Sequence, residues 1–225
     1  MLSVVKEVKS RHYDNAARQI QSVETRRRIL EAAAALMVER GYRATTVAEI
    51  ARRSGVHVDT VYELVGSKPV LLRELIEQAL SGADGAVVPE ERDYVKAILA
   101  EPDPARKLAI YARAVRNIQG RMAPLLLALR DASATEPEAK QVWQEISDRR
   151  AANMRNLAQN LEAAGGLRPG LSIDEAADVI WATNSSELYV LLTVERAWSP
   201  DRYERWLSDT WCRLLLPDTH REHQL

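Results

Sequence analysis

Cysteine is nearly absent from this sequence of 225 residues, and its histidines are few and scattered. Cys212 is the only cysteine, which excludes an internal disulfide and any metal site built from several thiolates, and we expect it to fill core space. The four histidines are His12, His57, His220 and His223, and none has a carboxylate or cysteine placed to suggest a catalytic triad or catalytic metal. The sequence therefore predicts a protein that is not an enzyme and needs no metal and no cofactor.

Long apolar runs and glycine-rich phosphate loops are also missing. No run reaches the roughly 18 apolar residues that a membrane span requires, and Lys6, Glu7 and Lys9 interrupt the start, where a signal peptide has its apolar stretch. The composition is 46% hydrophobic and 28% charged, which is typical of a soluble globular protein. We therefore expect a cytoplasmic protein that does not bind a membrane.

The charge is balanced overall but unevenly distributed along the chain. The net charge is -1, yet up to residue 58 the chain has 11 lysines and arginines against 6 aspartates and glutamates. The rest of the chain must then be acidic. A small basic head on an acidic body suits a protein that docks one end onto the phosphates of a nucleic acid.

Helical periodicity dominates the sequence, and strand-like alternation never extends beyond a few residues, so we predict an all-α fold. A first helix is expected over about residues 24–40 and is closed by Gly41. Thr46 and Glu49 have capping-box spacing, which predicts a second helix from Thr46, ended by Ser54 and Gly55. A third helix should follow the turn to about Leu64.

Ser67 and Pro69 are placed to start a fourth helix, which should lead to a domain boundary at residues 81–85. Six further helices are expected: from Pro89 to Leu99, from 103 to about 119, one carrying Leu125 to Leu129, from 135 to 165, from 172 to about 198, and from 199 to about 216. No internal repeat appears at periods of 20 to 50 residues.

Two short helices joined by a glycine-containing turn, braced by a longer helix, are typical of a helix-turn-helix, here about residues 46–64. The residues that go beyond this pattern are RRRILEAA at 26–33, ERGY at 39–42, TTVAEIA at 45–51, SGV at 54–56, TVY at 60–62, SK at 67–68 and LL at 71–72. This ordered set strongly resembles the TetR family of repressors over about residues 24–80.

The resemblance implies an N-terminal three-helix DNA-binding domain at 24–82 and a helical ligand-binding and dimerisation domain at 83–225. It also implies a homodimeric repressor that binds a palindromic operator and responds to a small molecule. The residues expected to bind DNA are Arg43, Thr45, Thr46, His57, Val58, Asp59, Thr60, Tyr62 and Lys68. Thr46, Tyr62 and Lys68 would contact phosphates, whereas His57 to Thr60 would read base edges.

The chain departs from the family pattern at four positions near the third helix. Leu64 and Val65 stand where the family usually has His or Tyr and then Phe, and Asp59 and Glu63 add negative charge. These departures support an alternative, in which a TetR-like protein with weakened or altered DNA binding serves as a small-molecule or protein-binding module. A structural helical adaptor is the other rival, and the dense match around the turn argues against it.

Residues 1–23 form an N-terminal extension that could be an extra helix, a basic arm or a poorly ordered end. In the C-terminal part, eight residues supply apolar surface suited to a dimer interface: Ile180, Leu188, Leu191, Leu192, Trp206, Trp211, Leu214 and Leu215. The candidates for an effector pocket are Met122, Leu126, Trp143, Met154, Trp181, Asn184 and Tyr189. Each could equally be core, and Asn184 with Ser185 and Ser186 could equally meet the second subunit.

Overall fold

The computed structural model describes residues 2–81, 88 and 91–218, and these residues form helices and no strand, which confirms the predicted all-α class. The chain divides into two compact units, residues 1–75 and 76–225. Among the described residues, no helix is both long and apolar enough to cross a membrane.

The first unit contains α1 (Leu2–Ala44), α2 (Val47–Ser54), α3 (Val58–Leu64) and the first half of α4 (Lys68–Ser81). The helix expected to begin near Glu24 begins at Leu2, so residues 2–23 extend it. Gly41 closes its regular part, as predicted, with a φ of 78°. The core is made by apolar side chains that α1, α2, α3 and α4 turn toward one another, among them Ile29, Ala33, Leu36, Ile50, Val61, Leu71 and Leu72.

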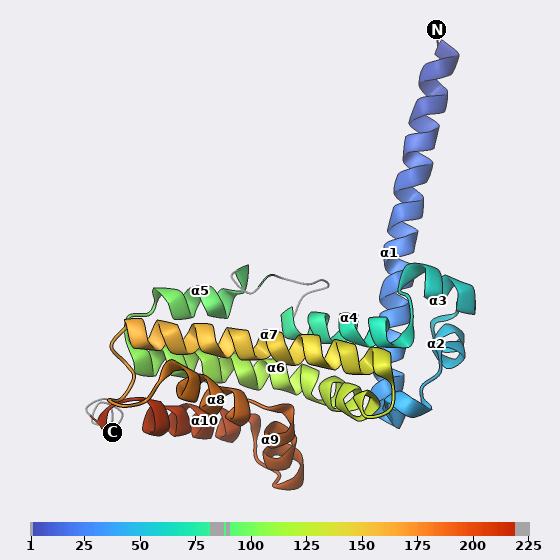
Figure 1. Cartoon of the computed structure of the whole chain (residues 1–225). Helices are drawn as coiled ribbons and strands as arrows, with labels where there is room; N and C mark the ends of the chain where they lie inside the picture. Colours follow the sequence, from blue (N-terminus) through green and yellow to red (C-terminus); the bar gives the residue numbers. More distant parts are fainter. Residues whose placement is uncertain (1, 82–87, 89–90, 219–225) are drawn as a thin grey trace. The chain divides into compact units, whose positions relative to one another are not determined.

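The second unit is built on two long helices, α6 (Pro104–Ser133) and α7 (Pro137–Ala163), which lie side by side. On one side α5 (Asp93–Ala100) packs on α6, and on the other α8 (Ile173–Thr183) packs on α7 and α10 (Pro200–Leu215) packs on α6 (Figure 1). Ser199 caps α10, as predicted. Buried residues face inward from every one of these helices, including Leu108, Leu129, Leu161, Ile180, Leu207 and Trp211.

Four predicted helix boundaries in this unit differ from the structure. The helices expected at 103–119 and around Leu125 are one helix, because Pro124 lies on its exposed side and the buried Met122, Leu125 and Leu126 hold both halves to one core. The helix expected to be capped by Thr135 begins instead at Pro137, whose fixed φ suits a first helical position.

The helix expected from 172 to 198 starts correctly with the Ser172 and Glu175 capping box but ends at Thr183. Ser185 then caps α9 (Ser186–Val190), which passes into a π-helical turn, η2 (Leu191–Glu195). The helix expected from Pro89 begins at Asp93. Pro89 itself, and residues 82–85 of the expected boundary, lie outside the described residues.

Candidate functional site

The turn between α2 and α3 is set by local chemistry that the sequence already displays. The Thr46 hydroxyl accepts the Glu49 backbone N–H at 3.2 Å, and the Glu49 carboxylate accepts the Thr46 backbone N–H at 3.0 Å. These bonds from Thr46 also hold the pKa of the Glu49 carboxyl below its usual value. Gly55 then turns the chain with a φ of 71°, a left-handed conformation that favours glycine. The predicted helix-turn-helix at residues 46–64 is thus present.

Helix α3 presents one side to the core and the other to solvent. Val61 is fully buried, and Val65 follows it into the core. One helical turn apart on the opposite side, Val58 is 39% exposed and Tyr62 is 52% exposed. His57 and Asp59 are exposed beside them, and Thr60 is half-buried. The predicted base-reading residues and Tyr62 therefore occur together at one surface, with Thr46 and Arg43 exposed at and just before the α2 cap.

Lys68 and Thr45 have structural contacts that sequence reasoning missed. The Lys68 ammonium donates to the carbonyls of Tyr42 at 3.1 Å and Thr45 at 3.2 Å, and it lies 3.9 Å from the centre of the Tyr42 ring. Thr45 is fully buried, and its hydroxyl donates to the Gly41 carbonyl at 2.9 Å. Lys68 thus holds the end of α1, where a cation is favoured by the helix dipole.

Several arginines counted in the basic head are paired with carboxylates in the same unit. Arg53 contacts Glu39 at 2.8 Å and Arg40 contacts Glu49 at 2.8 Å. The other pairs join Arg26 to Glu74, and Arg27 to both Glu24 and Glu31. Exposed pairs of this kind add little stability, but they reduce the local positive charge.

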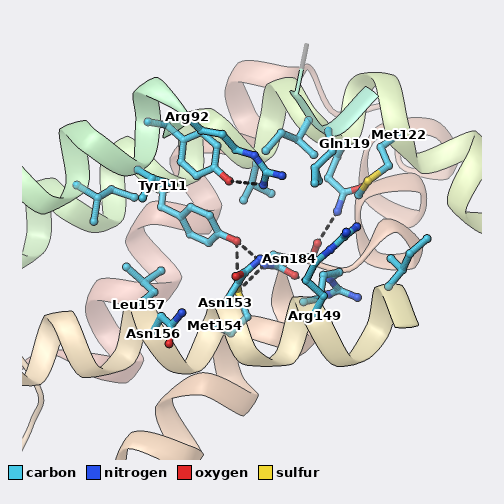
Figure 2. Close-up of a pocket in the computed structure, with 18 of the residues that line it drawn as sticks. Arg92, Tyr111, Gln119, Met122, Arg149, Asn153, Met154, Asn156, Leu157 and Asn184 are labelled. Carbon is cyan, nitrogen blue, oxygen red and sulfur yellow. Dashed lines mark hydrogen bonds between the residues drawn. The ribbon is translucent and has the colours of Figure 1, made fainter. Parts of the chain in front are cut away.

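The second unit contains a cavity of about 270 Å³ that is partly open to solvent (Figure 2). Its lining residues come from the end of α4, the segment at the start of α5, and α5, α6, α7 and Asn184. Three of the predicted pocket residues line it: Met122, Met154 and Asn184. The other four are not among its lining residues: Leu126 is buried on α6, Trp143 is half-buried on α7, Trp181 is exposed on α8, and Tyr189 packs edge-on against Tyr203.

Several polar side chains of the cavity wall form hydrogen bonds with Asn184, which lies directly after α8. Its side-chain NH₂ donates to the Tyr111 hydroxyl at 2.9 Å and to the Met154 sulfur at 3.0 Å, while its Oδ1 accepts from Arg150 at 2.6 Å. The Gln119 amide donates to the Asn184 carbonyl. Burial raises the pKa of the Tyr111 hydroxyl, so this group stays protonated and can donate to Met154. This network interrupts the helix after Thr183.

Arg92, Arg150, Tyr111 and Gln119 were not predicted as site residues. The contacts of Arg150, Tyr111 and Gln119 join positions 31 to 73 residues apart, which no local pattern reveals. The one available signal was the polar run beginning at Asn184 inside an otherwise apolar segment, because buried amides need partners.

The predicted dimer-interface residues divide into three groups by burial. Ile180, Trp211 and Leu215 are fully buried within this chain, so they belong to its own core. Leu191 and Leu214 are exposed, as are Trp181 and Val194, which were not in the predicted set. Leu188, Leu192 and Trp206 are half-buried.

Comparison with known proteins agrees with this architecture. Residues 29–75 match the family of bacterial regulatory proteins described as the tetR family. The uncharacterized HTH-type transcriptional regulator YvkB of Bacillus subtilis is 37% identical over 75 residues, which are 33% of this chain and 40% of YvkB. The matched part thus spans less than half of that relative.

Solved structures of regulators match over most of the chain. NalD, the secondary repressor of the MexAB-OprM multidrug efflux pump in Pseudomonas aeruginosa, has a TM-score of 0.68 at 25% identity and covers 88% of this chain and 98% of NalD. FadR from Bacillus subtilis, in complex with stearoyl-CoA, has a TM-score of 0.66 at 20% identity and covers 82% of this chain and 96% of FadR. A regulator from Saccharomonospora viridis in complex with choline has a TM-score of 0.65 at 21% identity and covers 86% and 98% of the two chains. The helix-turn-helix residues of this chain thus match the model of the TetR family of bacterial regulatory proteins, and its fold resembles that of solved transcriptional regulators.

Proposed function

We propose that this protein is a cytoplasmic, ligand-responsive transcription regulator, a repressor that binds a palindromic operator as a homodimer. The observation that carries the proposal is the exposed surface of α2 and α3, where Thr46, Val58 and Tyr62 lie around a capped two-helix turn. A helix of this kind enters the major groove while the helix before it crosses the backbone. The domains would be residues 24–82 for DNA binding and 83–225 for dimerisation and ligand binding, after an extension at 1–23.

Phosphate contacts would position the domain, and base contacts would give specificity. Thr46 lies at the N-terminus of α2, where backbone N–H groups and the helix dipole favour an anion. Tyr62 and Lys68 would hold the backbone on either side, with Arg43 as a further contact. His57, Val58, Asp59 and Thr60 would face base edges, and Asp59 would select a cytosine amino group.

A dimer would place two copies of α3 roughly 34 Å apart, as a palindromic operator requires. The surface that we assign to it consists of the exposed apolar residues Trp181, Leu191, Val194 and Leu214, which come from α8, η2 and α10. Each leaves apolar area in water that a second copy would bury.

The effector would act through the cavity of the second unit. A small molecule that binds one dimer geometry better than another shifts the population toward that geometry. The operator is released if the distance between the two copies of α3 in that geometry no longer matches the spacing of successive major grooves. Two of the similar structures are complexes with choline and with stearoyl-CoA, which supports a small-molecule effector for this protein.

A second candidate function is a small-molecule or protein-binding module with weakened or altered DNA binding. The exposed acidic side chains of Asp59 and Glu63 on α3, together with the paired arginines, favour it. Binding to DNA distinguishes the two candidates.

The test is selection of duplexes from a random library, followed by titration of the best duplex at several salt concentrations. We expect a palindrome bound by two chains, with affinity falling by about 10³-fold or more between 50 and 200 mM salt if six or more phosphates are contacted. Failure to enrich any duplex at low ionic strength would favour the second candidate.

The dimer is tested in the same assay with Val194→Glu, because Val194 is 68% exposed and has no core role. Sedimentation should show mainly single chains, and operator affinity should fall at least tenfold with the thermal unfolding midpoint nearly unchanged. Val38→Glu, at another exposed valine on α1, is the control for oligomeric state. A Val194→Glu protein that stays dimeric would overturn the assigned surface.

A further inference from the structure

The cavity of the second unit has an unusual balance of charge on its wall. Three arginines line it, Arg92, Arg149 and Arg150, together with the amide side chains of Gln119, Asn153, Asn156, Asn160 and Asn184. None of the described residues that line it is an aspartate or glutamate. Such a wall attracts a negatively charged group and repels a positively charged one.

The guanidinium of Arg150 donates its hydrogen bonds to neutral carbonyl oxygens and not to a carboxylate. It donates to the Trp181 carbonyl at 2.8 Å and to Asn184 Oδ1 at 2.6 Å, and its guanidinium lies 4.9 Å from the centre of the Trp181 ring. No carboxylate of residues 2–81, 88 or 91–218 lies within ion-pair distance of it. Burial lowers the pKa of the Arg150 guanidinium, and the opposing electrostatic effect of nearby groups, Glu187 among them, is smaller.

Arg92 is the most enclosed of the three arginines, with an exposed fraction of 7%. Arg92 occupies the N-cap position of α5, where its side chain makes no capping hydrogen bond, and its guanidinium donates to the Tyr94 hydroxyl at 3.4 Å. Arg149 forms an ion pair with Glu77. Figure 2 shows that Arg92 and Arg149 reach the cavity from opposite walls, with Asn184 between α6 and α7. An anionic head group in this space would therefore meet guanidinium groups from two sides.

The remainder of the wall is apolar. It is formed by Ile76, Leu80, Val95, Ile98, Leu99, Val115, Ile118, Met122, Ile146 and Leu157. The volume of about 270 Å³ lies at the small end of ligand pockets, which span roughly 300–1,000 Å³. A compact apolar body with a single polar head fits these dimensions.

Asn160 adds a second polar feature to this wall. Its Oδ1 is buried and has no hydrogen-bond partner among the described residues. Buried acceptors are rarely left without a donor, and a carboxylate has none to offer, so a water held in the cavity beside the ligand would satisfy this atom.

We propose that the cavity binds an amphipathic organic anion, a small monocarboxylate whose head lies between Arg92 and Arg150 and whose apolar body contacts α5 and α6. A guanidinium offers a planar pair of donors that matches a carboxylate, which makes arginine the suitable residue here. The inference rests on the proposed function in that this anion would be the effector, but its binding is measured without DNA.

The test compares three probes of one length on the full chain by titration calorimetry: octanoate, octanol and octylammonium. Octanoate should bind about tenfold or more tightly than octanol, because a hydrogen bond to a charged group contributes about 1.5–3 kcal/mol. Octylammonium should bind more weakly than octanol. Equal affinity for octanoate and octanol, or preference for octylammonium, would overturn the proposal.

Two variants locate the head group. Arg150→Gln retains an amide donor but removes the charge, so octanoate affinity should fall about tenfold while octanol affinity stays the same. Arg92→Gln removes the other guanidinium assigned to the head group and should have the same effect, so it serves if Arg150→Gln does not fold. Arg155→Gln is the matched control, because Arg155 lies on α7 outside the cavity and pairs with Asp174.

If both Arg92→Gln and Arg150→Gln bind octanoate like the parent, the assigned head-group position is wrong. Operator binding measured without any probe separates this inference from the proposed function. A protein that binds its palindrome but shows no preference for octanoate contradicts the ligand class alone, whereas a protein that binds no duplex contradicts the proposed function whatever the probes do.

Discussion

Replacement of Tyr62 by alanine should weaken operator binding by about 10- to 100-fold without lowering the stability of the protein. Tyr62 is 52% exposed on α3, opposite the buried Val61, so its ring and hydroxyl contribute to the surface and not to the core. A hydrogen bond to a charged phosphate contributes about 1.5–3 kcal/mol, which sets the size of the effect. Fluorescence anisotropy of a labelled operator measures it, and thermal unfolding checks the fold.

Lys68→Ala should affect both DNA binding and stability. Because Lys68 also holds the carbonyls of Tyr42 and Thr45, its loss should weaken operator binding and lower the unfolding free energy of the first unit by about 1–3 kcal/mol. Tyr62→Phe isolates the hydroxyl, and Val38→Ala, at an exposed position of α1, is the neutral control. If Tyr62→Ala and Lys68→Ala both bind like the parent, the docking geometry assigned to α2 and α3 is wrong.

Trp211→Ala should have the largest effect on stability, a loss of about 3–5 kcal/mol in the free energy of unfolding. Trp211 is fully buried on α10, stacks on Tyr111 with ring centres 5.3 Å apart, and donates from its indole N–H to the Thr183 hydroxyl at 2.7 Å. Truncation leaves a void beside Tyr111 and removes the Thr183 partner. Because Tyr111 lines the cavity, octanoate affinity should fall as well.

Denaturation by urea, followed by far-ultraviolet circular dichroism, measures this loss. Arg205→Ala is the matched control, since Arg205 is exposed on the same helix, and it should change stability by less than about 0.5 kcal/mol. A Trp211→Ala protein as stable as Arg205→Ala would mean that α10 does not pack on α6 as described.

The helix-turn-helix was predictable because its determinants are local. Thr46 and Glu49 form the capping box that their spacing indicates, and Gly55 adopts the left-handed conformation that ends α2. These signals depend on residues three or four positions apart, so they can be recognised without knowledge of the tertiary contacts. The start of α10 at Ser199 and Pro200 was predictable for the same reason.

The helices of the second unit were harder to delimit because their ends depend on distant contacts. Pro124 normally breaks a helix, but here the apolar residues on both sides of it bury against one core, so α6 continues. Asn184 ends α8 because its side chain is held by Tyr111 and Arg150 from two other helices. The cavity arginines could not be predicted for the same reason, because only the packing of α5, α6 and α7 brings Arg92 and Arg150 to the same cavity.

Hydroxyl-radical footprinting of the selected operator tests the central claim most directly, because it shows which part of the duplex the protein covers. If α3 of each chain enters the major groove, two protected patches should lie about one helical turn, 10–10.5 base pairs, apart on one face of the DNA. Both patches should fade when Tyr62 is replaced by alanine. A single unsymmetrical patch, or protection that Tyr62→Ala leaves unchanged, would contradict the claim that this surface of α2 and α3 binds DNA.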